Sequence, residues 1–276
     1  MGFRDLKFDE GSVFLVTGGA GFVGSNLCEA ILDLGYEVRC LDDLSTGKQE
    51  NVDFLMGRSG YTFIKGDIKD LDTCMKACEG VDYVLNQAAW GSVPRSIEMP
   101  LFYCANNISG TLNMLEAARI SGVKKFVYAS SSSVYGGNKE LPFSEDQSVD
   151  KPISLYAASK KANELMAHCY SHLYGMQTFG FRFFTVYGPW GRPDMAAWLF
   201  AKAMSEGRSI KVFNNGDMYR DFTYVDDIVD GLVRCIRKAP ELPRYDVFNI
   251  GNHRSEKVMD MIGIIAREMG VENPKM

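Results

Sequence analysis

The sequence lacks any apolar run near the roughly 20 residues that a membrane-spanning helix needs, and it lacks a cluster of basic residues. Its formal net charge is −5 and its isoelectric point is near 5.4, which argues against a nucleic acid or an anionic membrane as partner. The first residues, MGFRDLKFDEGS, are too charged for a signal peptide. We therefore expect a cytoplasmic protein that binds no nucleic acid and no membrane.

Disulfide and metal-binding patterns are missing as well. The seven cysteines are an odd number scattered along the chain, so we expect reduced thiols among apolar neighbours. His168 and His172 have the i, i+4 spacing of a zinc-binding helix, but the residues between them lack the glutamate of the H-E-x-x-H motif. Because no third ligand is suggested nearby, we expect no metal site.

What the sequence does contain is a regular alternation of short β-branched runs and longer helical patterns. Its 276 residues, of which 46% are hydrophobic, can bury a full core. The helix candidates are GSNLCEAILDLG, LDTCMKACEG, residues 101–119 and residues 154–174, and the strand candidates are SVFLVT, EVRCLD, YTFIKG, VDYVLNQ, KKFVYASS and QTFGFRFF. This alternation predicts an α/β fold with a Rossmann-type, doubly wound parallel sheet.

The pattern changes after about residue 184, where TVYGPWGRPDMA is typical of a functional loop. We expect it to be followed by a helix at 194–206, a strand at IKVF, a loop NNGDMYRDFTYVDD, a helix to about Lys238, a strand DVFNIG and a last helix. Residues 1–184 are thus expected to form the sheet domain. Residues 185–276 are expected to form mostly a smaller region at the carboxyl edge of the sheet, partly interleaved with it. Ligands of such sheets bind at that edge.

A glycine-rich turn indicates a dinucleotide site. In FLVTGGAGFVGSNL, Gly18, Gly21 and Gly24 stand between a strand and a helix with the spacing G-x-x-G-x-x-G. Such glycines let backbone amides approach a pyrophosphate at a helix N-terminus. The next strand ends in Asp42, whose carboxylate lies where a ribose 2′-hydroxyl is recognised and would repel a 2′-phosphate. The sequence therefore favours NAD over NADP, and a purely structural turn is the alternative.

The stretch SLYAASKKANE, residues 154–164, places Tyr156 and Lys160 four residues apart, so that both side chains rise from one face of the expected helix. A phenol has an ordinary pKa of about 10, and a neighbouring ammonium lowers it and favours the phenolate. The pair is therefore a candidate general base, with an ordinary amphipathic helix as the alternative.

Several motifs together carry a family resemblance: the glycine turn, NQAA, YASSSSVYG at 128–136, YAASK at 156–160 and YRDFTYVDD. In their order and spacing they resemble the extended short-chain dehydrogenase/reductase family, and within it the nucleotide-sugar 4-epimerases, most of all UDP-glucuronate 4-epimerases. The resemblance covers nearly the whole chain. It implies NAD as cofactor and a UDP-sugar as substrate, with 1–184 as the NAD-binding domain and 185–276 as mostly the UDP-sugar region.

By this resemblance, Tyr156 is the catalytic base, Lys160 binds the nicotinamide ribose and lowers the pKa of the tyrosine, and Ser131 bridges to the reacting sugar hydroxyl. The sugar would be inverted at C4 through a transient 4-keto form. The residues expected to bind the cofactor are Gly18, Gly21, Phe22, Val23, Gly24, Asp42, Asp43, Asp67, Ile68, Gln87, Ala88, Ala89, Asn107, Tyr156, Lys160, Phe183 and Val186. For Asp67 and Ile68, a helix N-cap and a core residue are the simpler interpretations.

The serine run favours epimerisation over other reactions of this family. Related dehydratases carry an acidic pair after the first hydroxyl residue, and related decarboxylases carry a glutamate before VYG, whereas this chain has Ser132 and Ser133. Arg220 matches the arginine that binds the nucleotide diphosphate in the family. The alternative for Arg220 is a surface ion pair with Asp221 or Asp217.

The choice of sugar rests on RFFTVYGPWGRPDMA, which resembles the uronate epimerases. Many hexose epimerases have asparagine where this chain has Thr185, and Thr185, Ser132 and Ser133 could donate hydrogen bonds to a C6 carboxylate. Arg192 is expected to help close the loop over the sugar. The alternative for Thr185 is loop packing. The run AAWGSVPRSIEMP is closer to the UDP-N-acetylhexosamine epimerases, so that substrate stays open.

Three further expectations come from the family. A homodimer is expected, with the helices at 101–119 and 154–174 as candidates for its interface. Family members usually continue into a second Arg-x-Gly-Asp-type segment, so we expect that this sequence, which stops at VENPKM, is truncated or partly ordered. The functional alternatives are a non-catalytic NAD-sensing protein and an NAD-consuming reductase or dehydrogenase of the same fold.

Overall fold

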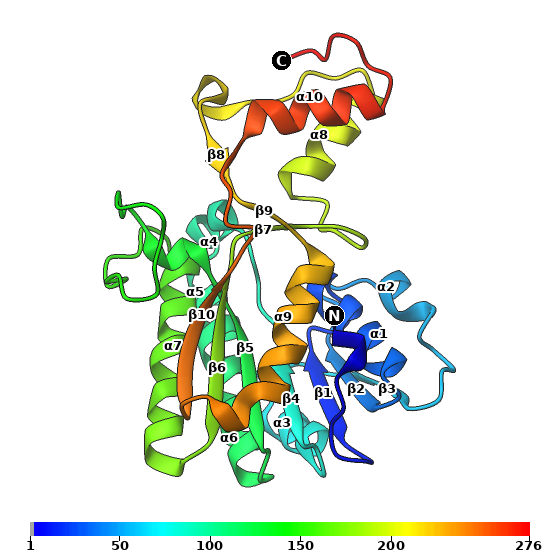
Figure 1. The fold of residues 1–276 in the computed structure, drawn as a ribbon, viewed down its shortest axis with the longest axis vertical. Coiled ribbons are helices and arrows are strands. Elements are labelled where there is room, and N and C mark those ends of the chain that lie inside the picture. The colour runs from blue at the N-terminus through cyan, green and yellow to red at the C-terminus, as the bar shows by residue number, and fades with distance from the viewer. Residues whose placement is uncertain (1–2) are drawn as a thin grey trace. The chain divides into compact units, whose positions relative to one another are not determined.

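The main sheet has seven parallel strands in the order β10-β6-β5-β4-β1-β2-β3 (Figure 1). The computed structural model describes residues 3–276. The strands are β1 Val13–Thr17, β2 Glu37–Asp42, β3 Tyr61–Lys65, β4 Tyr83–Asn86, β5 Lys125–Ser131, β6 Gln177–Phe183 and β10 Tyr245–Ile250. The predicted Rossmann-type sheet is confirmed, and the six predicted strands and DVFNIG all lie in it.

Helices connect the strands of this sheet. They are α1 Phe22–Asp33, α2 Glu50–Asp53, α3 Leu71–Cys78, α4 Val93–Glu98, α5 Pro100–Tyr103, a π-helix Cys104–Ser109, α6 Gly110–Ile120, α7 Leu155–Tyr174 and α9 Val225–Lys238. Short 3-10 helices span Phe3–Asp5, Ser132–Tyr135 and Ala239–Glu241. Helix α7 lies along β5, β6 and β10 (Figure 1).

The apolar faces of α3, α6 and α7 explain why these segments pack on the sheet. Their buried side chains meet those of β1, β2, β4 and β5 in one hydrophobic core, to which Leu15, Ala77, Leu115, Phe126 and Ala167 belong. Burying a side chain as large as Leu15, Leu115 or Phe126 stabilises the fold by about 1.5–3 kcal/mol.

The chain order reverses between β1 and β4, which are neighbours in the sheet. Connections run outward from this point in both directions, and a crevice at the carboxyl ends of the strands is the usual ligand site of such a sheet.

The structure divides into two compact units. The larger comprises the residues up to Phe183 and Asp226–Ile250, and the smaller comprises Phe184–Val225 and Gly251–Met276. The division of labour expected at residue 184, with cofactor binding before it and sugar binding after it, stays a prediction.

The smaller unit has its own elements and core. Strand β7 Thr185–Tyr187 pairs with β9 Phe222–Tyr224, and β8 Tyr219–Arg220 pairs with β11 Glu256–Lys257. Helices α8 Ala196–Ser205 and α10 Val258–Glu268 and the 3-10 helix Phe213–Gly216 complete it. Phe200, Met204, Ile210 and Ile262 are buried together.

Three expectations about local structure are wrong. IKVF is not a strand: Ile210 donates one backbone hydrogen bond, 2.8 Å to the carbonyl of Lys275, and otherwise serves the core. The loop NNGDMYRDFTYVDD contains the strands β8 and β9. The single helix expected at 101–119 is interrupted by the π-helix, a wider turn that holds Asn106 and Asn107 inside.

Candidate active site

The glycine turn follows β1 at the reversal point of the sheet. Gly18 has φ +66°, and a Cβ there would lie 2.7 Å from the backbone nitrogen of Ala88. A Cβ on Gly24 would lie 2.8 Å from the Cα of Gly19 and closer still to the carbonyl oxygen of Gly18. Gly21 caps α1, which begins at Phe22 and continues through Val23. A side chain at Gly18 or Gly24 would therefore prevent the close approach of α1 to the glycine turn.

Asp42 ends β2 beside that turn and is only 7% exposed. Its Oδ2 accepts a hydrogen bond from the Ala20 amide at 3.0 Å, and its Oδ1 accepts one from the Leu44 amide at 2.8 Å. Burial raises the pKa of Asp42, and those two amides offset the rise in part. Each carboxylate oxygen still has a lone pair for a ligand hydroxyl. The neighbouring Asp43 accepts the Ser45 amide.

Asp67 and Ile68 follow β3. Asp67 is not the N-cap of α3, since Asp70 holds that position, and its Oδ1 accepts the Lys69 amide at 2.8 Å. Ile68 is a core residue, so that interpretation is confirmed. A Cβ on Gly110 would come within 2.6 Å of the Ile68 side chain. Contact of either residue with adenine stays a prediction.

Gln87, Ala88 and Ala89 follow β4, which lies next to β1. Both polar atoms of the Gln87 side chain are buried without a hydrogen-bond partner among the described residues. An unpaired buried amide costs about 1–3 kcal/mol, which a polar ligand could relieve. The orphaned amide, the glycine turn and the Asp42 carboxylate together fit NAD, whose diphosphate and ribose hydroxyls need close backbone and a hydrogen-bond acceptor.

Asn107 is fully buried in the π-helix and serves an internal contact. Its Oδ1 accepts the Trp90 amide at 2.8 Å, and its Nδ2 donates to the Trp90 carbonyl at 3.1 Å and to Ser159 Oγ at 3.1 Å. It thus joins the loop after β4 to α7. The expected contact with the cofactor stays a prediction.

Tyr156 and Lys160 lie in the first two turns of α7, whose N-cap Ser154 accepts the Ala157 amide at 3.1 Å. Lys160 is 3% exposed, and its Nζ donates to the carbonyl of Ala129 in β5 at 2.8 Å. The half-buried ring of Tyr156 meets the Tyr103 ring edge to face, with centroids 6.4 Å apart. Helix spacing and the contact with Ala129 thus place both side chains at a defined height along β5.

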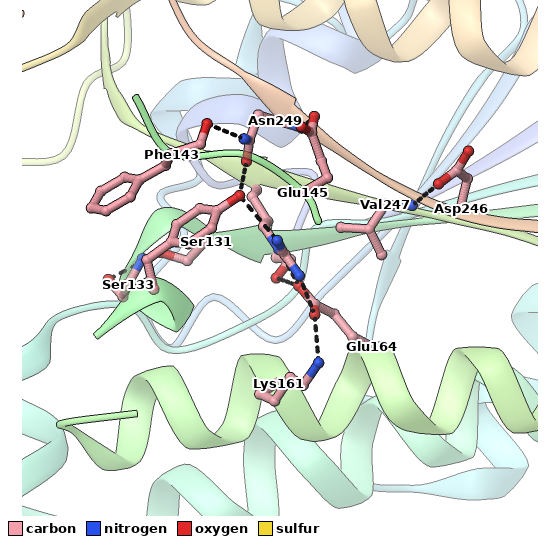
Figure 2. Close-up of polar contacts among 12 residues, drawn as sticks. Ser131, Ser133, Phe143, Glu145, Lys161, Glu164, Asp246, Val247 and Asn249 are labelled. Carbon is pink, nitrogen blue, oxygen red and sulfur yellow. Dashed lines mark hydrogen bonds and ion pairs between the residues drawn. The ribbon is translucent and has the colours of Figure 1, made fainter. Parts of the chain in front are cut away.

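Ser131 ends β5 and begins the serine run. Its Oγ donates to Ser133 Oγ at 3.1 Å and accepts the Ser133 amide at 3.2 Å, which caps the 3-10 helix that starts at Ser132 (Figure 2). The hydroxyl of Ser133 accepts one hydrogen bond and keeps its own proton for another.

The remaining predicted residues fall in or near the smaller unit. Phe183 ends β6 in the larger unit, and Val186 is buried in β7. The amide of Thr185 donates to the Asp221 carbonyl at 3.0 Å. Arg192 makes a two-pronged ion pair with Asp194, at 3.0 and 2.7 Å. A sugar contact of any of these residues stays a prediction.

Arg220 is exposed and donates to the carbonyl of Tyr219 at 2.8 Å. The alternative ion pair with Asp221 or Asp217 is not among the ion pairs of residues 3–276, and the Asp221 carboxylate accepts from Thr223 and Asn252 instead. Contact of Arg220 with a diphosphate stays a prediction.

A buried polar network that was not predicted from the sequence lies next to the serine run and is centred on Glu164 and Arg182 (Figure 2). Two signals could have found it. Glu164 follows Tyr156 and Lys160 at the same four-residue spacing, and Arg182 is a charge inside the otherwise apolar strand QTFGFRFF.

The parallel sheet, the glycine turn at its reversal point, Asp42 and the Tyr156–Lys160 face of α7 define a Rossmann-type nucleotide-binding protein of the short-chain dehydrogenase/reductase kind. Residues 14–251 match the NAD dependent epimerase/dehydratase family, and the chain belongs to that family. The predicted family, the NAD dependence and the enzyme class are thereby confirmed.

Individual relatives agree with this assignment. The chain is 40% identical to UDP-glucuronate 4-epimerase 4 of Arabidopsis thaliana, over 97% of this chain and 66% of the relative. It is similar to the structure of UDP-glucuronic acid 4-epimerase from Bacillus cereus in complex with UDP-glucuronic acid and NAD, with TM-score 0.88 and 35% identity over 96% of this chain and 85% of that one. It is also similar to the UDP-N-acetylglucosamine 4-epimerase from Methanobrevibacter ruminantium M1, with TM-score 0.88 and 32% identity over 96% and 84%.

Two negative observations concern only residues 3–276. None of the helices there is long and apolar enough to cross a membrane. No group of three His, Cys, Asp or Glu side chains there could hold a metal ion. The cytoplasmic location stays a prediction.

Proposed function

We propose that this chain is an NAD-dependent 4-epimerase of UDP-sugars and that it interconverts UDP-glucuronate and UDP-galacturonate. The observation that carries the proposal is the run Ser131–Ser133 at the end of β5, which has hydroxyls where dehydration and decarboxylation would need a carboxyl group. The relatives named as UDP-glucuronate 4-epimerases support the choice of substrate.

Three residues of the larger unit are proposed to carry out the proton transfer. Tyr156 takes the proton of the sugar 4-hydroxyl, and Ser131 holds that hydroxyl by a hydrogen bond. The buried ammonium of Lys160, fixed to Ala129, favours the phenolate of Tyr156. Bound NAD supplies the hydride acceptor and donor for C4, so the sugar passes through a 4-keto form without net change in the cofactor.

Three hydroxyls and two arginines are proposed to recognise the rest of the substrate. Ser132, Ser133 and Thr185 donate to the C6 carboxylate, Arg220 contacts the diphosphate and Arg192 helps to close the loop over the sugar. Holding the carboxylate matters because a 4-keto uronate loses carbon dioxide readily when that group can rotate. Fixed hydroxyl donors would suppress this side reaction.

A second candidate substrate is UDP-N-acetylglucosamine. It is favoured by the run AAWGSVPRSIEMP and by the likeness to the Methanobrevibacter enzyme. The two candidates differ at C2 and C6 of the sugar, so they place different demands on Thr185.

A substrate comparison tests the proposal. Purified protein is incubated with UDP-glucuronate, UDP-N-acetylglucosamine or UDP-glucose, and the products and NADH are measured for the wild type and for Thr185→Val. We expect UDP-glucuronate to give the highest kcat/KM with no net NADH. Thr185→Val should lower that value about 10- to 100-fold, because a hydrogen bond to a charged group contributes about 1.5–3 kcal/mol.

The control is Thr62→Val, the same change at an exposed position of β3, which should leave turnover unaltered. A higher kcat/KM for UDP-N-acetylglucosamine, or uronate turnover that survives Thr185→Val, contradicts the carboxylate assignment. Net NADH would indicate a dehydrogenase, and absence of any product a non-catalytic NAD sensor.

We also propose a homodimer built on α6 and α7. Leu112, Ile120, Leu165 and Leu173 are exposed on these two helices, at 40% to 66%, and paired helices would cover them. Light scattering measures the mass in solution, and a monomer across the working concentrations contradicts this assembly.

A further inference from the structure

A row of polar side chains crosses three neighbouring strands below the end of the main sheet. In the parallel register, Ser130 of β5 lies opposite Arg182 of β6, and Arg182 lies opposite Asn249 of β10. Side chains at such paired positions project from the same face. The row ends one residue before Ser131, so it adjoins the serine run.

Glu164 of α7 packs directly on this row (Figure 2). Its Oε1 accepts from Ser130 Oγ at 2.7 Å and from Arg182 Nε at 2.9 Å, and its Oε2 accepts from Arg182 Nη2 at 3.0 Å. Glu164 is 1% exposed and Arg182 is 3% exposed. One carboxylate therefore joins α7, β5 and β6 at a single point.

The network continues from Arg182 through Tyr135 and Asn249 to Phe143 and Glu145. Arg182 Nη1 donates to the Tyr135 hydroxyl at 3.0 Å, and that hydroxyl donates to Asn249 Oδ1 at 2.7 Å. The side-chain Nδ2 of Asn249 donates to the Phe143 carbonyl at 3.1 Å, and the backbone N–H of Asn249 donates to Glu145 Oε1 at 2.6 Å (Figure 2). The buried polar groups of this network are thus engaged, which makes it rigid.

The placement of Glu164 on α7 gives the network its significance. Tyr156, Lys160 and Glu164 follow one another at four-residue intervals, so their side chains leave neighbouring parts of one helix face. Lys160 reaches β5 at the Ala129 carbonyl and Glu164 reaches it at Ser130. Both contacts therefore tie the same helix to the strand that ends in Ser131.

Stability alone is a weak reason for such a pair. Burying a carboxylate and a guanidinium costs desolvation free energy that their attraction often only balances, and apolar residues of similar volume can be as stable or more so. Burial alone would lower the pKa of Arg182, but the hydrogen bonds and the charge of Glu164 outweigh burial and raise it. A two-pronged pair does, however, fix the position and orientation of the carboxylate relative to the guanidinium.

We infer that Glu164 and Arg182 are positioning residues, which hold α7 against β5 so that Tyr156 and Ser131 meet the same sugar hydroxyl. This inference rests on the proposed function. In this inference neither residue touches the reacting atoms. The pair acts by fixing the position of α7 along β5. A misplacement of about 1 Å at a catalytic group can cost about 100-fold in rate, so a small slide of the helix is enough to matter.

The test uses the double variant Glu164→Gln/Arg182→Met. It removes both buried charges together and keeps an acceptor for Ser130. The new amide N–H group and the Tyr135 hydroxyl lose partners, which lowers the stability of the variant, but no buried charge is left unpaired, so the variant should still fold. The single variant Glu164→Gln would strand the Arg182 charge and is expected to unfold more easily, which is why the double variant decides. Circular dichroism and thermal unfolding check the fold.

We expect the double variant to lower kcat about 10- to 100-fold while KM for the UDP-sugar stays within about two-fold of the wild type. A pair that served only folding would leave kcat of the folded protein unchanged. The control is Lys161→Met, one turn away, whose Nζ lies 3.5 Å from Glu164 and whose loss leaves the Arg182 pair intact. Its kcat should match the wild type.

The outcomes separate this inference from the function beneath it. If the wild type converts none of the UDP-sugars, the proposed function fails and the positioning role fails with it. If the wild type turns over and the folded double variant keeps its kcat, only the positioning role is overturned. An equal loss in Lys161→Met would also overturn it, because the effect would then belong to the helix surface.

Discussion

Gly24→Ala tests whether the close approach of α1 to the glycine turn sets both stability and NAD affinity. The new Cβ would stand 2.8 Å from the Cα of Gly19 and from the carbonyl carbon of Gly18, and nearer still to the Gly18 oxygen. Real Cβ atoms essentially never come within 3.0 Å of such neighbours, so the helix and the turn must move apart. Both partners are backbone, which cannot swing aside.

The expected magnitude follows from two opposing effects. Overpacking of this kind costs about 1–3 kcal/mol, and backbone partners favour the upper end. Alanine inside a helix gains about 1 kcal/mol over glycine. We therefore expect Gly24→Ala to lower the free energy of unfolding by about 2 kcal/mol. NAD affinity should fall at least about 10-fold, since the amides that we expect to face the pyrophosphate would move with the turn.

Gly263→Ala is the matched control, because Gly263 also lies within a helix, α10, and a Cβ there meets nothing within 4 Å. It should be neutral or stabilising and should bind NAD like the wild type. Chemical unfolding and calorimetric titration with NAD measure the two quantities. The steric reasoning is refuted if Gly24→Ala matches Gly263→Ala in both.

Two further substitutions examine the site. Tyr156→Phe should keep the fold and the bound NAD yet lose at least about 100-fold in kcat, because the hydroxyl is the proposed proton acceptor; turnover at the wild-type level would remove Tyr156 from that role. Asp42→Asn should weaken NAD binding and reduce the preference of the protein for NAD over NADP, because it removes the charge that would repel a 2′-phosphate. Titration with both cofactors measures this preference. Because burial raises the pKa of Asp42, its carboxylate gains a proton at higher pH than an ordinary aspartate. NAD affinity of the wild type should therefore fall on acidification more steeply than that of Asp42→Asn, and parallel pH profiles would count against this carboxylate.

The sheet was predictable because its strands carry their own signals. SVFLVT and KKFVYASS are short β-branched runs with helical patterns between them, and such periodicity survives without knowledge of tertiary contacts. IKVF has the same composition but is not a strand. Ile210 is buried beside Ile262 in the core of the smaller unit and Val212 packs against that core, whereas Phe213 is exposed. No neighbouring strand pairs with this segment among the described residues. An apolar composition alone does not specify a strand, because a strand also needs a neighbouring strand with which to pair.

Some residues of the candidate site could likewise be predicted from local sequence patterns, and others could not. Glycine spacing and the Tyr156–Lys160 interval are local, so the sequence alone identifies them. Asn107 and Glu164 act through residues 52 and 34 positions away along the chain, Ser159 and Ser130, and no local pattern specifies such pairs. The buried pair of Glu164 and Arg182 suggests why Glu164 is built into α7. A helix can carry a tyrosine and a lysine at the right interval and still present them at the wrong height, because apolar packing tolerates sliding more readily than a two-pronged hydrogen bond does. In the mechanism that we propose, the local motif supplies the chemistry of the proton transfer, and the long-range polar contacts supply its position.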